Sequence, residues 1–145
     1  MRSGSSITCA RISDTTMGIP IQIRCDGITL QAELNDSPAA QAVADALPVT
    51  APASRWGDEI YFTVDVDAEL APDARTEMAV GELAFWAPGR VVCILFGPTP
   101  ASHGEEPRLV SEGNPIGMIL DDAAALRDVA DGAAVTLEPT IEDPS

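Results

Sequence analysis

The sequence contains no lysine: all eight basic residues are arginines, and they stand against 23 aspartates and glutamates, so the formal net charge is −15. A chain with this balance repels phosphate backbones, so we expect no nucleic-acid partner. Self-repulsion among the acids is tolerable where high salt screens it. The acidity therefore fits a salt-loving source or a GC-rich genome about equally well.

Histidine is almost absent, because His103 is the only one and it stands in a Gly- and Pro-rich stretch among acids. A triad or metal site that needs imidazole groups therefore has little material. Asp65, Asp67 and Glu69 alternate like the start of a calcium loop, but Leu70 replaces the glycine that the sharp turn requires. The chain also lacks a Cys-x-x-Cys pair, a phosphate loop, a dinucleotide fingerprint and a nucleophile elbow. We expect no metal and no cofactor, and hydrolase, kinase and dinucleotide-binding functions lose most of their support.

Long hydrophobic runs are missing too. The longest extends from Val91 to Phe96, far short of the ~20 residues that span a bilayer, and the N-terminus lacks the apolar stretch of a secretory signal. We therefore expect a cytoplasmic protein without a membrane partner. Cys9, Cys25 and Cys93 are widely spaced and odd in number, and two of them stand in apolar, strand-like runs. This pattern favours structural free thiols in a reducing compartment.

A chain of 145 residues with 46% hydrophobic content fits one domain, because it can bury roughly 68% of the surface that its unfolded form exposes. We assign residues 1–145 to this single domain. Its core is expected over about 19–138, with frayed ends at 1–8 and 139–145.

Alternation of apolar and polar residues predicts β-strands as the main elements. A hairpin is expected from 19–25 and 28–34 around the turn signal Asp26-Gly27. Residues 59–66 predict a half-buried strand. Residues 83–86 and 91–96 predict a second hairpin whose later strand is buried on both faces.

Two short helices and three loops accompany the strands. Ser37-Pro38 supplies an N-cap and a first-turn proline for a helix that runs to about Leu47. The remaining expectations are irregular segments at 48–55, 67–75 and 97–108, strands near 116–120 and 134–137, and a helix that begins at Asp121 or Asp122 and ends near Gly132. Six or more strands with two short helices indicate a closed or nearly closed β-barrel.

Three rigid, aromatic stretches with few charges stand out at 56–62, 81–89 and 96–102. Binding loops are often built this way. Aromatic side chains that simply plug the ends of a barrel give an equally good interpretation.

Five stretches in this order carry a family resemblance: Leu34–Pro38, Trp56–Phe62, Gly81–Gly89, Phe96–Ser102 and Asn114–Gly117. On them the chain resembles a family of small uncharacterised prokaryotic proteins with a cyclophilin-like β-barrel, over about 19–138. Glu82, Phe85 and Ala87 replace the Asp, Tyr and Pro expected at those places. The resemblance implies a mainly β fold: a closed barrel of about eight strands capped by two short helices.

The first functional hypothesis is a binding module of unproven activity, whose cleft takes a small molecule or a peptide. Aromatic walls would supply apolar contact, while hydroxyl and amide groups would orient the ligand. The candidate ligand-binding residues are Trp56, Glu59, Tyr61, Phe96, Thr99, Ser102 and Asn114. The protein is expected to be a monomer or a homodimer.

The alternative is a peptidyl-prolyl cis/trans isomerase, which must lower a barrier of ~18–20 kcal/mol. Arg55 and Arg108 are weak catalytic candidates as hydrogen-bond donors, and the Phe-x-Arg pair and the Gln-Gly-Gly-Asp run of true cyclophilins have no counterpart here. A hydrolase or lyase that uses Glu59 or Glu106 with Asn114 ranks third, because it needs a carboxylate with a perturbed pKa.

The sequence leaves open whether Glu33 and Asn35 face the cleft or support the turn before the helix.

Overall fold

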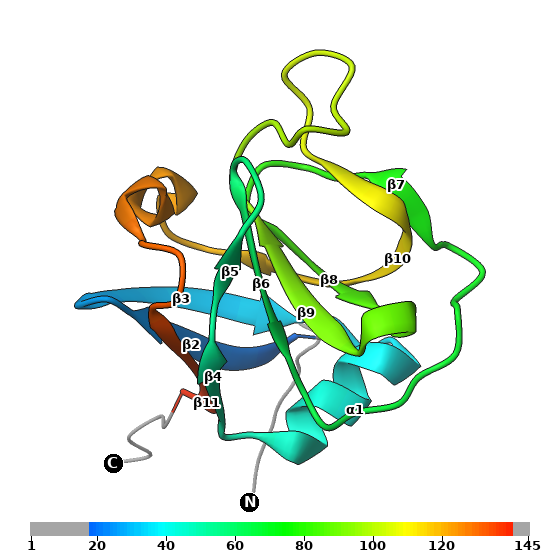
Figure 1. Ribbon diagram of the computed structural model, residues 1–145. Coiled ribbons are helices and arrows are strands. Elements are labelled where there is room, and N and C mark those ends of the chain that lie inside the picture. Colours follow the sequence, from blue (N-terminus) through cyan, green and yellow to red (C-terminus); the bar gives the residue numbers. More distant parts are fainter. Residues whose placement is uncertain (1–17, 141–145) are drawn as a thin grey trace, which may run out of the picture.

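The computed structural model describes residues 18–140, which form a mainly β structure with short helices. Ten strands make one curled sheet in the order β4-β11-β2-β3-β10-β8-β9-β6-β5, with β7 paired to β10 (Figure 1). The strands are β2 (Ile19–Cys25), β3 (Ile28–Leu34), β4 (Val49–Pro52), β5 (Ser54–Arg55), β6 (Glu59–Thr63), β7 (Arg75–Glu77), β8 (Glu82–Trp86), β9 (Val91–Leu95), β10 (Arg108–Ile119) and β11 (Ala134–Pro139). The helices are α1 (Pro38–Ala46) and the 3-10 segments η2 (Ala87–Gly89) and η3 (Ala123–Asp128).

The first hairpin is confirmed. Strands β2 and β3 pair in antiparallel register up to Cys25 opposite Ile28. Asp26 and Gly27 both adopt positive φ angles, 52° and 80°, as a tight two-residue turn between right-twisted strands requires.

The first helix is confirmed as well, and it covers one end of the curled sheet (Figure 1). The Ser37 hydroxyl accepts a hydrogen bond from the Ala40 amide at 3.2 Å, and Pro38 occupies the first turn. Val43 is fully buried. The second helix is shorter than expected, since η3 is a 3-10 segment that begins after Asp122.

Residues 48–55 were expected to be irregular, but they contain both edge strands of the sheet. Strand β4 pairs with β11, and β5, which follows after Ala53, pairs with β6. The two ends of the strand order thus meet in one segment. Between residues 18 and 140 no backbone pairing joins β4 to β5, so closure by hydrogen bonds, as in a closed barrel, is not seen.

Strand β10 is much longer than the expected strand near 116–120. Gly113, Pro115 and Gly117 interrupt the alternation of apolar and polar residues along it. The register shifts between Arg108 and Gly113 and again between Pro115 and Gly117. Gly117 is required by packing: a Cβ there would lie 2.3 Å from the carbonyl oxygen of Glu33 on β3. The short strand β7, which pairs with the first half of β10, was not expected either.

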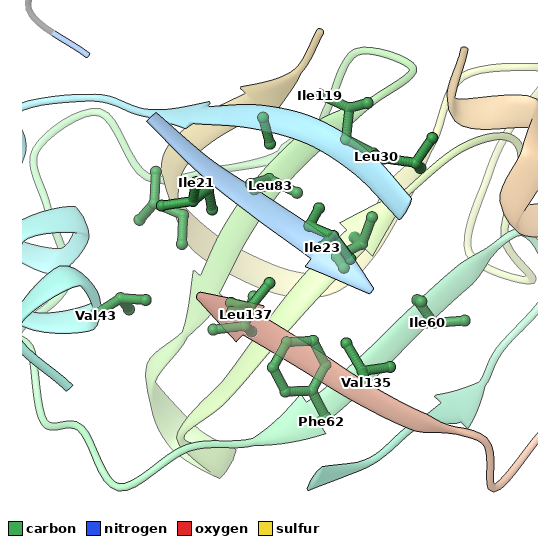
Figure 2. Packing of buried hydrophobic residues seen from close by; sticks show 14 of the residues in the cluster. Ile21, Ile23, Leu30, Val43, Ile60, Phe62, Leu83, Ile119, Val135 and Leu137 are labelled. Atoms are coloured by element: carbon green, nitrogen blue, oxygen red, sulfur yellow. The ribbon is translucent and has the colours of Figure 1, made fainter. Parts of the chain in front are cut away.

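The sheet carries a hydrophobic cluster on each face near β6, β8 and β9. Alternate residues of β6, Ile60 and Phe62, point into the main core with Val135 and Leu137 of β11 (Figure 2). The opposite face carries a smaller cluster of Met78, Ala84, Val91, Cys93, Leu95 and Leu109, against which Tyr61 and Trp86 pack. Strand β9 is therefore buried on both faces, as its apolar run predicts.

The expected strand 59–66 is regular only to Thr63, although Val64 and Val66 are still buried. Pro139 ends β11 rather than beginning a frayed end. Residues 1–8 and 141–145 lie outside the described part of the chain. No described helix is both long and apolar enough to cross a membrane.

Candidate functional site

A cavity of about 400 Å³ opens on the face of the sheet that carries the smaller cluster. We call it the aromatic pocket. Its lining consists of three aromatic residues, aliphatic side chains, one thiol and one acid: Trp56, Glu59, Tyr61, Trp86, Gly89, Val91, Cys93, Leu109 and Val110.

Strand alternation places four of these side chains on one face. In the antiparallel pairing of β6 with β9, Tyr61 stands opposite Cys93 and Glu59 opposite Leu95. Side chains two residues apart point to the same face of a strand. Glu59 and Tyr61 therefore share a face with Val91 and Cys93, and the core residues between them on β6 point away.

Trp56 reaches the pocket from a tight turn before β6. The Trp56 amide donates to the carbonyl oxygen of Glu59 at 2.9 Å, and Gly57 has a φ of 63°. The loop that follows β9 fixes this turn, because the Asp58 amide donates to the Pro98 carbonyl at 2.9 Å. The position of Trp56 and Glu59 therefore depends on the loop that follows β9.

Trp86, at the end of β8, forms part of the wall. Its indole Nε1 donates to the Ser111 hydroxyl at 2.7 Å, which fixes the orientation of the ring. Gly89 leaves room for that ring, since a Cβ there would lie 3.0 Å from Cζ3 of Trp86. Two segments, 86–89 and β10, thus hold this side of the pocket.

Glu59 is the only acidic side chain among the described residues that line the pocket, and it is 3% exposed. Its Oε1 is buried and has no hydrogen-bond partner among the described residues. Burial raises the pKa of Glu59 to about 7, and the hydrogen bond with the Cys93 thiol opposes this rise only in part. Near neutral pH the site can therefore hold either a neutral carboxylic acid or a carboxylate.

Cys93 contributes its thiol to the same wall. Burial raises the pKa of Cys93 well above its usual value, and the negative charge of Glu59 raises it further. A protonated, buried thiol is a poor nucleophile. Cys93 thus serves as a small apolar side chain and a weak hydrogen-bond donor, not as a reactive group.

Three candidate residues from the sequence meet in this pocket: Trp56, Glu59 and Tyr61. The other four candidates do not line it. Phe96 is 1% exposed and belongs to the main core, with the Arg55 guanidinium over its ring at 5.1 Å.

Thr99 and Ser102 are engaged with each other and with backbone carbonyls that follow them in the chain. The Thr99 amide donates to the Ser102 hydroxyl at 2.8 Å, and the Thr99 hydroxyl donates to the carbonyl of Arg108. The Ser102 hydroxyl donates to the carbonyl of Glu106. The loop 97–102 does not line the pocket, and it supports the turn at Gly57 through the hydrogen bond from the Asp58 amide to the Pro98 carbonyl.

Asn114 is 1% exposed and anchors the segment between β6 and β7. Its amide nitrogen donates to the Glu69 carbonyl at 2.9 Å, and its oxygen accepts from the Ala71 amide at 2.7 Å. Both functions of its side chain are occupied by backbone groups.

The two arginine candidates are held by the protein itself. Arg55 donates from Nε to the Gly57 carbonyl at 3.2 Å and from Nη1 to the carbonyls of Arg127 and Val129. Arg108 donates from Nε to Glu106 at 3.0 Å and from Nη1 to Thr76 at 3.0 Å. Neither arginine lines the aromatic pocket.

Glu106 and His103 lie outside the pocket as well. Hydrogen bonds from the His103 backbone, from its own backbone amide, from Arg108 and from the Gly104 backbone lower the pKa of Glu106 to about 2. His103 is exposed. Within residues 18–140 no group of three or more His, Cys, Asp or Glu side chains is arranged to hold a metal ion.

Glu33 and Asn35 face a different, smaller cavity of about 240 Å³, beside Glu82 and Gly117. The Asn35 side chain accepts from the Ser37 amide and donates to the Pro115 carbonyl, both at 3.0 Å. Asn35 therefore supports the turn before α1.

The sequence interpretation missed six lining residues: Trp86, Gly89, Val91, Cys93, Leu109 and Val110. The first two fall in the stretch 81–89, whose aromatic composition could have identified them as candidates. The β9 residues could have been found by requiring them to share a face with Tyr61. Leu109 and Val110 carried no such signal, because they stand between the expected loop 97–108 and the expected strand near 116–120 and were assigned to neither.

The chain matches the cyclophilin-like family over residues 19–138. It is also similar to the solution structure of a hypothetical protein from Archaeoglobus fulgidus, with 36% sequence identity, coverage of 86% of this chain and 96% of the other, and a TM-score of 0.73. No match is found among curated proteins. The resemblance seen in the five sequence stretches is thereby confirmed, and the chain belongs to the cyclophilin-like family.

Proposed function

We propose that the protein is a binding module that takes a small molecule or a peptide segment in the aromatic pocket. A volume of about 400 Å³ falls within the range of small-ligand sites. Aromatic rings on several sides supply apolar contact area with little loss of side-chain freedom. These features suit a ligand with an apolar body.

The observation that carries the proposal is the buried acid in this apolar lining. A buried polar oxygen without a partner costs roughly 1–3 kcal/mol, and more when it is charged. Glu59 Oε1 bears this cost among the described residues. A ligand that donates a hydrogen bond to the Glu59 carboxyl would reduce this cost, which links binding to the buried acid.

The proposal includes a barrel closed through residues 49–55. The Ala53 amide donates to the Ala133 carbonyl at 2.8 Å, which continues the pairing of β4 with β11 up to the start of β5. A segment that pairs first with β11 and then with β6 joins the two ends of the strand order into a ring. Such closure would hold β6, with Glu59 and Tyr61, in a fixed position before any ligand arrives.

The alternative, prolyl isomerisation, needs a donor that reaches the prolyl amide nitrogen. The guanidinium groups of Arg55 and Arg108 already donate to groups of the protein and do not line the pocket. These contacts favour binding over isomerisation.

Intrinsic fluorescence tests the proposal, because the chain has two tryptophans and both line the pocket. Indole, 2-phenylethanol, 2-phenylethylamine and a short prolyl peptide serve as probes. A probe of about nine non-hydrogen atoms reaches a millimolar Kd with about 0.45 kcal/mol per atom, which small ligands exceed readily. We expect at least one probe to change the emission saturably at millimolar concentration or below.

Two exposed valines give the matched control. Val110 is 65% exposed and lines the pocket, whereas Val80 is 57% exposed and does not. Val110→Arg should weaken binding at least about fivefold and Val80→Arg should not. Absence of any saturable change, or equal effects of the two variants, would refute the proposal, and clear catalysis in a protease-coupled prolyl-peptide assay would favour the isomerase.

A further inference from the structure

The aromatic pocket has a lining that distinguishes ligands by charge. It contains one carboxyl group and three aromatic side chains, and no arginine is among the described residues that line it. Aromatic ring faces carry negative potential and attract cations. An anionic ligand would meet the Glu59 carboxyl and no cationic side chain among the described lining residues, and the net charge of −15 adds to the repulsion.

The buried acceptor distinguishes ligands by hydrogen bonding. Glu59 lines the pocket and its buried Oε1 has no partner among the described residues, so its carboxyl group is a strong acceptor that the protein does not fully satisfy. The Cys93 thiol is the neighbouring donor, and it is weak. A ligand must therefore bring a hydrogen on nitrogen or oxygen, and a positively charged donor forms the stronger bond.

We propose that the aromatic pocket binds an alkylammonium group that keeps at least one N–H, with this N–H donating to the carboxylate of Glu59 and with Trp56, Tyr61 and Trp86 around the positive charge. The inference rests on the proposed function, because it names the ligand class of the same pocket.

Charge compensation supports this ligand class. A buried carboxylate is costly unless a counter-ion accompanies it. The guanidinium of Arg55, the nearest in sequence, bonds to the carbonyls of Val129, Arg127 and Gly57. An ammonium ligand would supply the missing charge to Glu59.

The alkylammonium can come from a free amine or from a lysine side chain of a peptide. The sequence of this chain contains no lysine, so a second copy cannot supply such a side chain. The two sources share the chemistry that the pocket recognises. Parallel titrations with n-butylamine and with N-acetyl-lysine methylamide distinguish them.

The decisive experiment compares isosteric probes by tryptophan fluorescence at pH 8. The probes are 2-phenylethylamine, its neutral isostere 2-phenylethanol and the quaternary analogue N,N,N-trimethyl-2-phenylethylammonium. We expect the amine to bind at least about tenfold more tightly than the alcohol, because hydrogen bonds between charged groups are stronger than those of neutral groups. The quaternary analogue should bind more weakly than the amine, because it has no N–H.

Glu59→Gln tests the anchor, and Glu112→Gln is its control. Glu112 is exposed and lines a different cavity. Both substitutions replace one carboxyl group with an amide, so the control reproduces the change in charge. We expect Glu59→Gln to weaken the amine at least about tenfold and the alcohol by less than about twofold. Glu112→Gln should weaken the amine by less than about twofold.

A pH series on the wild-type protein gives a second measurement that needs no variant. The titratable side chains that share the lining with Glu59 are Tyr61 of β6 and Cys93 of β9, and β10 brings only Leu109 and Val110. The pKa of Glu59 is about 7, and an alkylamine stays protonated far above this pH. Affinity for the amine should fall roughly tenfold per pH unit below about pH 7, while affinity for the alcohol stays constant.

Each outcome bears on a definite claim. Equal affinity for amine and alcohol, an equal effect of Glu59→Gln and Glu112→Gln, or a flat pH profile for the amine would overturn the ligand class and leave the binding function intact. No saturable response to any probe would overturn both. Binding of either butylamine or the lysine derivative supports the inference, the tighter one identifying the source, and binding of neither overturns it.

Discussion

The carboxyl group of Glu59 lies against the thiol of Cys93, diagonally across the pairing of β6 with β9. Neither group has a charged partner in the pocket lining, which otherwise consists of rings, aliphatic side chains and Gly89. An apolar residue at position 59 would be easier to bury. An acid whose pKa is raised by burial, inside a cavity, is a typical sign of a functional group.

This burial predicts an unusual dependence of stability on pH. The folded protein keeps a proton on Glu59 up to about pH 7, whereas the unfolded chain releases it near pH 4.5. The contribution of protonated Glu59 to the free energy of unfolding is therefore fully present below pH 4.5 and is lost as the pH rises to about 7. The glutamine in Glu59→Gln cannot ionise. The free energy of unfolding of this variant, taken relative to that of the wild type, should therefore be about 3 kcal/mol higher at pH 8 than at pH 4.

Urea denaturation of both proteins at several pH values measures this difference. Glu112→Gln, which removes an exposed acid, should follow the wild-type curve. A constant gap between Glu59→Gln and the wild type from pH 4 to 8 would show that the carboxyl has an ordinary pKa.

Consecutive residues of β6 give the second prediction, because Tyr61 is half-buried at the pocket and Phe62 is 2% exposed in the main core. Phe62→Ala should cost about 3–5 kcal/mol of unfolding free energy. Tyr61→Ala should cost clearly less, since part of its ring already faces solvent. Equal losses in chemical denaturation would mean that Tyr61 is a core residue and not a wall of the pocket.

The third prediction concerns the two described cysteines, which are free and buried. Burial raises the pKa of both thiols. A thiol reagent at neutral pH should therefore modify Cys25 and Cys93 only after unfolding, whereas occupancy of the pocket by a ligand should slow Cys93 further. Peptide mapping by mass spectrometry reads each site separately, and rapid modification of Cys93 in native buffer would contradict its burial. Cys9 lies outside the described residues.

Net charge gives the fourth prediction. With a formal charge of −15, repulsion among carboxylates opposes folding, and salt screens this repulsion. The melting temperature should rise by several degrees between 0.05 and 2 M sodium chloride. A flat or falling series would favour genome composition as the origin of the acidity.

The fold could be read from the sequence wherever side chains alternate along a strand. The hairpin 19–34 was predicted in register, because its turn and both strands carry local signals. Strand β10 was predicted only near its end, because Gly113, Pro115 and Gly117 interrupt its alternation. Gly117 is required by the close approach of β3, which a local pattern does not record. The short strands β4 and β7 exist through pairing with the distant strands β11 and β10, and β5 is only two residues long.

The site was predicted in part for the same reason. Trp56, Glu59 and Tyr61 belong to one continuous stretch, so they stay together in the fold. Loop 97–102 has the composition of a binding loop, but its hydroxyl groups donate to the backbone carbonyls of Arg108 and Glu106. Distinguishing a wall from a support needs the tertiary contacts.

The last prediction tests this support through Gly57. Its φ of 63° costs about 1–2 kcal/mol for a residue with a Cβ, and that Cβ would lie 2.8 Å from Cδ of Pro100 and 2.9 Å from Cα of Thr99. Gly57→Ala should therefore push the turn away from loop 97–102 and shift Trp56 and Glu59. We expect a lower melting temperature and at least about tenfold weaker binding of the probes that change the tryptophan emission of the wild type.

Gly27→Ala is the matched control, because Gly27 also has a positive φ, 80°, but nothing lies within 4 Å of the added Cβ. Gly27→Ala should lose stability from backbone strain alone, while probe affinity stays within about twofold of the wild type. Both are measured by thermal melts and tryptophan fluorescence. Equal affinity of the two variants would mean that the position of Trp56 and Glu59 does not depend on the packing of loop 97–102 against Gly57.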